Sequence, residues 1–340
     1  MTAPLLEVEG LHVEFPTDDG IVTAVDGLSF TVERNEVLGI VGESGSGKTV
    51  TAMAALGLLP DHARVGGEIR LEGQPLTGLA ERDLRAVRGR RVAMVFQDAL
   101  AALNPVLTVG SQIGEAITAH DDSVGRTDLR ARVRDLLDLV GVPPDRATRY
   151  PHEFSGGMRQ RAMIAMAIAN DPDVLIADEP TTALDVTVQA HVLDVLDRVR
   201  ERTSASLLLI THDLGVVAGM ADRVLVMYAG RAAEVGSVEQ VFYESRHPYT
   251  LGLLASLPRI DRGAREDRLF RIAGSPPSLL RVPAGCPFHP RCFRAELPEP
   301  CSTVRPDPST GASGAHLAAC HFAGEVAAVT PDMLRARASR

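Results

Sequence analysis

The sequence has no long apolar run. Its longest apolar patch covers only residues 163–169, whereas a bilayer-spanning helix needs about 20 such residues. The first residues also lack the basic start and the long apolar segment of a signal peptide. These absences predict a cytosolic chain that meets a membrane only through another subunit.

The sequence also lacks an excess of basic residues. Lysine and arginine number 35 against 44 acidic residues, which gives a net charge of −9. A protein that binds nucleic acid through a basic face needs the opposite balance, so we expect no nucleic-acid partner. With 340 residues, 45% of them apolar, the chain is long enough for two domains, or for one large domain with an appendage.

Cysteine is absent until the last fifth of the chain, where all four cysteines occur: Cys286, Cys292, Cys301 and Cys320. In a cytosolic protein such a cluster suggests a metal before disulfides. The spacing is not C-x-x-C, and four thiolates can hold either an iron–sulfur cluster or zinc. Several prolines keep this segment out of regular helix, so a small loop domain here would need a metal to hold it together. Free thiols or disulfides remain a third alternative.

A glycine-rich stretch matches the phosphate-binding pattern G-x-x-x-x-G-K-[ST] at every fixed position: Gly42, Glu43, Ser44, Gly45, Ser46, Gly47, Lys48 and Thr49. Residues 37–41 before it predict a short buried strand, and residues 49–59 after it predict a helix. This order aims backbone N–H groups and a helix N-terminus at a phosphate chain. Lys48 would bridge the terminal phosphates, and the Thr49 hydroxyl would ligate Mg²⁺.

Three further predicted buried strands end in polar side chains: Gln97 after residues 92–96, Asp178 and Glu179 after 174–177, and His212 after 207–210. Ligands lie off the carboxyl ends of parallel strands, so one nucleotide could meet all of these groups. Asp178 suits the magnesium ion, and Glu179 can polarise an attacking water. Gln97 could hold the magnesium or the water, and His212 could contact the terminal phosphate. A helix-capping pair before Pro180 is the structural alternative for the two carboxylates.

The remaining segments predict two kinds of structure. Residues 5–32 alternate apolar and polar positions in short runs, which is typical of antiparallel strands with one wet face. Within them Phe15 could stack on a nucleotide base or be an ordinary core aromatic. Residues 111–140 predict helices, and another helix begins at Ser155 with an apolar stripe at helical spacing.

The stretch at residues 154–161, which contains Ser155, Gly156 and Gly157, resembles the signature sequence of ATP-binding-cassette (ABC) ATPases. His212 resembles the switch histidine of that family, and six motifs follow the family order over residues 5–240. The resemblance implies an α/β fold: a RecA-like parallel sheet core, an antiparallel β subdomain and a helical subdomain at about residues 98–171. It also implies that two cassettes pair head to tail, so that Ser155, Gly156 and Gly157 act on nucleotide held by the partner.

Wider stretches are similar to the ATPase subunits of bacterial di- and oligopeptide importers, including residues 95–98, 150–155, 247–250 and 285–292. This resemblance implies an ABC ATPase domain over residues 1–255 and a small loop-rich C-terminal extension over 256–325. In that extension Cys286, Cys292, Cys301 and Cys320 would hold a 4Fe–4S cluster, with zinc as the alternative. We expect residues 326–340 to form a loose tail.

The resemblance also implies a function. The chain would hydrolyse ATP with Mg²⁺ at the cytoplasmic face of the cell membrane, as a peripheral subunit that drives peptide uptake. Its partners would be a second ATPase subunit, two transmembrane permease subunits and an extracytoplasmic solute-binding protein. The resemblance favours a sister chain over an identical copy as the second ATPase subunit. Import of nickel, glutathione or opine-like solutes is the alternative. A soluble ABC ATPase outside transport fits less well, because neither a long coiled coil nor a second cassette is present.

Overall fold

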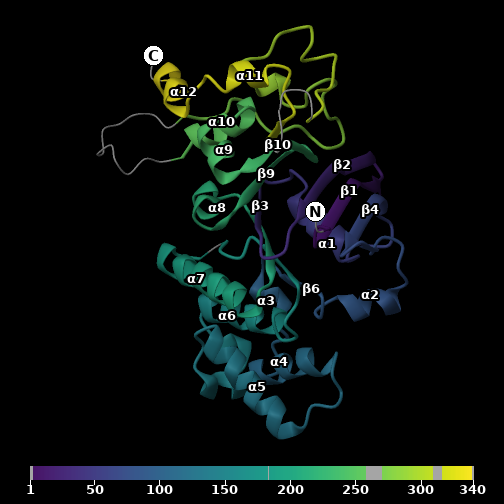
Figure 1. Ribbon diagram of the computed structural model, residues 1–340, viewed down its shortest axis with the longest axis vertical. Helices are drawn as coiled ribbons and strands as arrows, with labels where there is room; N and C mark the ends of the chain where they lie inside the picture. The colour runs from purple at the N-terminus through teal and green to yellow at the C-terminus, as the bar shows by residue number, and fades with distance from the viewer. Residues whose placement is uncertain (1–2, 183, 258–269, 309–315, 339–340) are drawn as a thin grey trace.

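The computed structural model describes residues 3–182, 184–257, 270–308 and 316–338 (Figure 1). Its central sheet has seven strands in the order β11–β10–β9–β3–β8–β7–β6. Strands β3, β6, β7, β8 and β9 are parallel, and β10 and β11 extend one edge in antiparallel pairing. The bounds are β3 Val37–Val41, β6 Val92–Val95, β7 Val174–Asp178, β8 Ser206–Thr211, β9 Arg223–Tyr228, β10 Arg231–Ser237 and β11 Leu317–Ala318.

The parallel strands are buried on both faces, as their continuous apolar runs predict. In β7, Val174 and Ile176 join one apolar core while Leu175 and Ala177 join the other, because successive side chains of a strand point to opposite faces. One core is completed by helices α4 to α7, and the other by α1 and a second sheet.

The second sheet is antiparallel, with the order β2–β1–β4–β5. Its strands are β1 Leu6–Thr17, β2 Gly20–Val32, β4 Arg64–Leu71 and β5 Gln74–Pro75. The sequence predicts several short runs between residues 5 and 32, but the structure makes two long strands with a turn after Thr17. Register shifts between Val8 and Leu11 let the apolar alternation change phase without ending β1.

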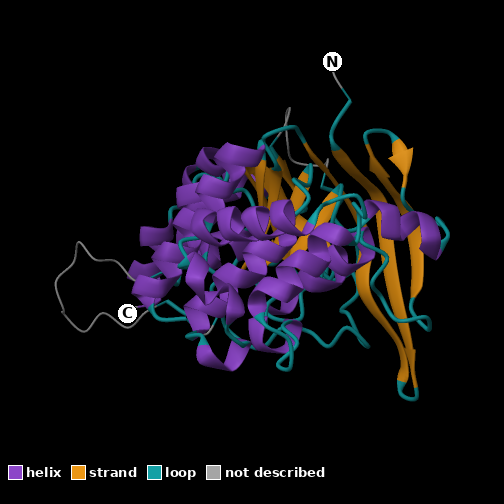
Figure 2. Cartoon of the chain, turned by 90° about the horizontal axis from the view of Figure 1, so that it is seen from below, coloured by secondary structure: helices purple, strands orange, loops and turns teal. Residues whose placement is uncertain are grey.

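Most of the helices gather on one side of the molecule and the long strands lie on the other (Figure 2). They are α1 Lys48–Ala55, α2 Glu81–Val87, α3 Ala99–Ala102, α4 Val109–Thr118, α5 Arg126–Leu139, α6 Gly156–Ala167, α7 Val186–Thr203, α8 Leu214–Met220, α9 Val238–Tyr243, α10 Pro248–Ala255, α11 Ala323–Val326 and α12 Pro331–Ala338. In the part of the chain that the structure describes, none of them is both long and apolar enough to cross a bilayer.

The C-terminal end of the chain returns to the central sheet and packs on α10. Strand β11 pairs with β10, and residues of α10, α11 and α12 share a small apolar cluster that includes Leu334. The sequence predicts a loose tail over residues 326–340, whereas the described part of that stretch includes helix α12, in which Leu334 is buried. Helix α12 is held there because the Arg335 guanidinium donates to the carbonyl oxygens of Ala255 at 2.8 Å and Leu254 at 2.9 Å.

Candidate active site

A cavity of about 500 Å³ opens at the carboxyl ends of four adjacent strands. Its lining comes from the glycine-rich loop after β3, Gln97 after β6, Glu179 after β7 and His212 after β8, and the loop contributes Ser44, Gly45, Ser46, Gly47, Lys48, Thr49 and Val50. The parallel order β3–β8–β7–β6 places these groups at one edge. The structure therefore brings together the strand-end residues that the sequence predicts.

The glycines of the loop are required by close backbone contacts. Gly47 has φ +100°, and a Cβ atom there would lie 2.5 Å from the carbonyl oxygen of Ala24. A Cβ atom on Gly42 would lie 2.3 Å from the Met227 carbonyl oxygen. Only glycine fits both positions. Within the described structure the buried Ser46 hydroxyl has no hydrogen-bond partner, so this hydroxyl is available to a ligand in the cavity.

Lys48 begins helix α1 and carries the buried cation of the site. Lys48 is only 5% exposed, and its Nζ donates to the carbonyl oxygens of Gly42 at 2.8 Å and Glu43 at 3.1 Å. Burial lowers the pKa of Lys48, and the nearby carboxylates of Glu179 and Asp178 oppose that shift. An anionic ligand such as a phosphate chain would relieve the cost of this desolvated charge.

Asp178 and Thr49 form a pair of hard oxygen donors. The Thr49 hydroxyl donates to Asp178 Oδ1 at 3.2 Å, and Asp178 is 1% exposed. Burial raises the pKa of Asp178, while the hydrogen bond from Thr49 opposes that rise. Magnesium prefers oxygen ligands of this kind, so the donor set fits the predicted Mg²⁺.

Glu179 is held by a network that fixes its carboxylate at the cavity. Its backbone has φ +45°, an unusual conformation for a residue with a side chain. Oε2 accepts from the Thr182 hydroxyl at 2.7 Å and from Gln97 Nε2 at 3.2 Å, and it lies 3.3 Å from His212 Nδ1. Sequence reasoning missed Thr182, although its spacing of three residues from Glu179 was a usable signal.

Gly42, Glu43 and Asp178 do not line the cavity but are hydrogen-bonded to Lys48 or Thr49, which do. Two further groups of predicted residues lie away from the cavity. Phe15 packs edge to face with His62, with ring centroids 6.2 Å apart, and belongs to the margin of a core cluster. Ser155 caps helix α6 by accepting from the Met158 N–H at 3.3 Å. Gly156 and Gly157 follow it beside Leu184 and Val188. Among the described residues this helix start contributes nothing to the cavity of its own chain.

The four cysteines are free thiols that line one small cavity with Phe288 and Phe322. The sulfur atoms of Cys292 and Cys320 each accept a backbone N–H at 3.4 Å, and burial raises both thiol pKa values to about 12. Over the described ranges, no group of three or more His, Cys, Asp or Glu side chains could hold a metal ion. The geometry therefore shows neither the iron–sulfur centre nor the zinc site that the sequence suggests.

Two family models match the chain. One, described as ABC transporter, matches residues 25–182, and the other, described as oligopeptide/dipeptide transporter C-terminal region, matches residues 233–298. The first covers the strand-end cavity up to Thr182. The second covers most of β10, helix α10 and two of the four cysteines.

Curated relatives resemble the chain over nearly its whole length. The chain is 54% identical to an oligopeptide transport ATP-binding protein of Mycobacterium tuberculosis. The match covers 94% of this chain but only 52% of the relative. The chain is 48% identical to a dipeptide transport ATP-binding protein of Bacillus subtilis, with 90% of this chain and 93% of the relative covered. It is 50% identical to an oligopeptide transport ATP-binding protein of Salmonella typhimurium, with 89% of each chain covered.

Solved structures share the fold. The chain resembles CbiO1 of Clostridium perfringens, part of the cbiONQ ABC transporter complex, with 27% identity and a TM-score of 0.60. That match covers 71% of this chain and 91% of the other. The dimeric ATP-binding cassette MJ0796, bound to ADP and Pi, aligns with 68% of this chain and 98% of its own at a TM-score of 0.62 and 23% identity. Both matches support the cassette fold.

Proposed function

The chain belongs to the ATP-binding proteins of peptide-transporting ABC systems, and from that membership we propose that it is the ATP-hydrolysing subunit of a di- and oligopeptide importer. One observation carries the enzymatic part of this proposal. A glycine-rich loop with a buried lysine faces a carboxylate, an amide and an imidazole across a single cavity. Phosphoryl transfer to water needs mainly this combination of positioning and charge.

Each group of the cavity has a role in the proposed hydrolysis of ATP. The loop amides, the Ser46 hydroxyl and Lys48 would bind the phosphates. Thr49, Gln97 and Asp178 would hold Mg²⁺, which supplies charge neutralisation when bound. Glu179 would orient the attacking water and accept its proton, since its carboxylate is fixed by Thr182 and Gln97. His212 would contact the terminal phosphate from beside Glu179.

The proposed partners follow from surfaces away from the cavity. Ser155 and Gly156 are exposed at the start of α6. Their hydroxyl and amide donors suit a phosphate that is held by a second ATPase subunit, for which we favour a sister chain over an identical copy. In the segment at residues 98–112, Leu100 is 56% exposed and Val106 is 75% exposed. This apolar surface suits a contact with one of two transmembrane permease subunits, at the cytoplasmic face of the membrane. An extracytoplasmic solute-binding protein would deliver the peptide.

Uptake of labelled peptides tests the transport role. Cells that make the complete importer with this chain are expected to take up di- or oligopeptides, and the same cells with Glu179→Gln in this chain should lose that uptake. Peptides of graded length then rank the substrates. Equal uptake with both forms would contradict peptide import through this chain, and nickel, glutathione and opine-like solutes would be assayed next in the same cells.

We further propose that Cys286, Cys292, Cys301 and Cys320 hold a 4Fe–4S cluster in the extension. The support is that four free thiols surround one cavity, with backbone N–H groups already directed at two of the sulfurs. A cubane cluster separates its thiolates more widely than a single zinc ion does, so it suits thiols that do not converge on one point. When bound, the cluster would hold together a segment with little regular structure.

The metal content of the purified chain tests this assignment. Protein prepared without oxygen is expected to be brown and to contain about four irons per chain. Cys301→Ser should lower the iron content and the visible absorbance together. A colourless preparation with one zinc per chain would reject the cluster in favour of zinc, and protein free of both metals would reject any metal centre.

A further inference from the structure

The glycine-rich loop is held from outside the ATPase core by a residue of the C-terminal extension. The Arg291 guanidinium donates to both carboxylate oxygens of Glu43, from Nη1 to Oε2 at 2.6 Å and from Nη2 to Oε1 at 3.0 Å. These two residues are 248 positions apart in the sequence. A bidentate pair of this kind fixes direction as well as distance.

Arg291 is itself rigidly placed. The residue is only 9% exposed, its Nε donates to the Ala273 carbonyl oxygen at 3.0 Å, and its guanidinium lies near the rings of Tyr228 and Phe288, 5.8 and 5.9 Å from their centroids. Stacking and hydrogen bonding of this kind leave a guanidinium few alternative orientations. Glu43 is therefore held by a fixed cation rather than by a mobile surface side chain.

A second contact restrains the same residue of the loop. The Glu43 N–H donates to the Tyr249 hydroxyl of helix α10 at 2.9 Å, and Tyr249 is fully buried. The Glu43 carbonyl oxygen accepts from Lys48 Nζ. Side chain, N–H and carbonyl of Glu43 are thus all engaged, so the position of Glu43 bears directly on the residue that meets the phosphates.

The Glu43 carboxylate would otherwise oppose nucleotide binding. It is a partly exposed anion, with 28% of its side chain accessible, in the same loop as the residues that line the cavity, and like charges repel even where solvent screens them in part. Arg291 neutralises this carboxylate and draws it to the side of the extension. Without the ion pair to Arg291, the negative charge of Glu43 would repel the phosphates of the ligand.

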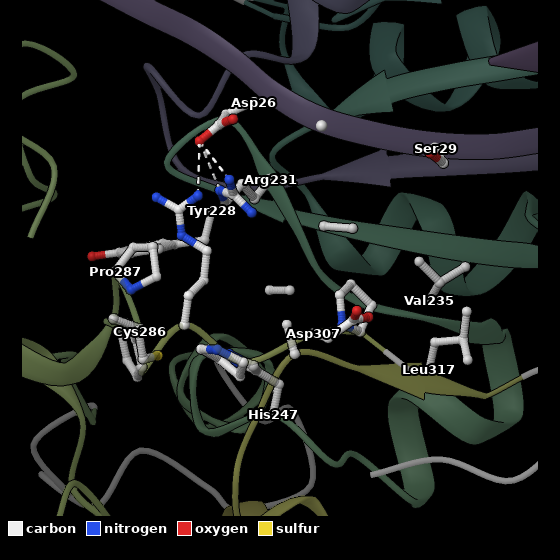
Figure 3. A pocket seen from close by; sticks show the side chains of 18 residues that line it. Asp26, Ser29, Tyr228, Arg231, Val235, His247, Cys286, Pro287, Asp307 and Leu317 are labelled. Carbon is white, nitrogen blue, oxygen red and sulfur yellow. Dashed lines mark hydrogen bonds and ion pairs between the residues drawn. The ribbon is translucent and has the colours of Figure 1, made fainter. Parts of the chain in front are cut away.

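Arg291 also connects the loop to residues 286–301, which contain three of the four cysteines and which we call the cysteine segment. It directly precedes Cys292 and is the last residue of a turn of 3₁₀ helix, His289–Arg291, which follows Cys286 in the sequence. A cavity of about 530 Å³ lies beside this contact, and Cys286 and Pro287 line it together with Arg231 and Asp26 (Figure 3). The hydrogen bonds between the described part of the cysteine segment and the glycine-rich loop come from Arg291.

We propose that Arg291 is a positioning residue through which the folded state of the cysteine segment sets the affinity of the glycine-rich loop for ATP. This inference rests on the proposed ATP site and adds a control of that site by the extension. When the segment is intact, Arg291 holds Glu43 aside and the loop binds nucleotide. When the segment loosens, the pair separates and the affinity falls.

The test measures binding of Mg²⁺ with a non-hydrolysed ATP analogue, adenylyl imidodiphosphate, to the full chain by calorimetry. Arg291→Met keeps an unbranched apolar stem beside Tyr228 and Phe288, and it is expected to weaken binding about tenfold, within the usual range of coupling between sites. Arg291→Lys keeps the charge but not the fork, and its loss should be smaller. Arg85→Met is the control, because Arg85 is an exposed arginine that pairs with Glu81 on helix α2, outside both the glycine-rich loop and the extension.

Combining Arg291→Met with Glu43→Gln distinguishes an effect through the Glu43 carboxylate from a general loss of folded structure. If Arg291 acts through the Glu43 carboxylate, Arg291→Met should change affinity less than about twofold in the Glu43→Gln chain. An undiminished tenfold loss there, or an equal loss in Arg85→Met, would overturn the proposal.

Hydrogen exchange of residues 42–47 provides a second measurement that needs no nucleotide. Arg291→Met should speed exchange in this loop, whereas Arg85→Met should leave it unchanged. Faster exchange throughout the chain would mean general unfolding and would overturn the specific link. Failure of the unaltered chain to bind the analogue would instead reject the ATP site, while the exchange comparison would still decide whether Arg291 restrains the loop.

Discussion

Glu179→Gln is expected to slow ATP hydrolysis at least about 100-fold while ATP still binds. The amide keeps the size of the side chain and can still pair with Thr182, but it does not accept a proton from water. The phosphate-binding loop, Lys48 and Thr49 are untouched by the change, so binding of the nucleotide should persist. Steady-state phosphate release and equilibrium binding of ATP, measured on the same preparation, check both halves of this expectation.

Glu201→Gln provides the matched control, because Glu201 is an exposed residue near the end of helix α7. It should hydrolyse ATP at the unaltered rate. Normal turnover in Glu179→Gln would remove Glu179 from the proposed mechanism and would direct attention to Gln97 and His212, which share its network. Loss of binding along with turnover would mean that Glu179 supports the cavity rather than the chemistry.

The strand-end cavity could be predicted from the sequence because its parts obey local rules. A buried apolar run followed at once by a polar residue marks the carboxyl end of a parallel strand, and such ends share one edge of the sheet. The backbone conformation of Glu179 could not be predicted in this way, because nothing in the sequence around it requires a φ of +45°. Its N–H is satisfied instead by the carbonyl oxygen of Ile210 on the neighbouring strand, at 2.8 Å.

The contacts of the C-terminal region could not be predicted for a different reason. Arg291 and Glu43 carry no shared periodicity, and their meeting depends on how a loop segment with little regular structure returns to the core. The same holds for Arg335, whose hydrogen bonds to the carbonyl end of α10 turn an apparently polar tail into a packed helix. Pairs of this kind are decided by tertiary packing, which local propensity does not encode.

Lys48→Met is expected to weaken ATP binding at least about 30-fold, as loss of one partner of a buried charge pair does. Lys48 is the only lysine of the chain. Thermal unfolding with and without Mg²⁺ and ATP measures the effect. Ligand at 100 times its Kd stabilises the unaltered protein by about 2.7 kcal/mol, and most of that gain should vanish in the variant. A full gain in Lys48→Met would contradict the role given to this cation.

The same variant should respond differently to pH when no nucleotide is bound. Burial lowers the pKa of Lys48 in the folded chain below its ordinary value of 10.5, so the charged lysine costs stability below the folded-state pKa. This cost disappears as pH rises through that pKa toward 10.5, since the unfolded chain then holds more protons than the folded one. Lys48→Met lacks the cost, and its stability relative to the unaltered chain should be greatest at neutral pH and should shrink in alkaline solution.

Selective labelling gives an independent measurement of the same cation. Because Lys48 is the single lysine, an amine reagent has only this side chain and the N-terminal amine as targets. Mg²⁺ and ATP should block labelling of Lys48 and leave the N-terminal amine reactive in the same sample, which serves as the internal control. Equal labelling of Lys48 with and without ATP would place the phosphates elsewhere, because a lysine that holds a phosphate chain has no lone pair free to react.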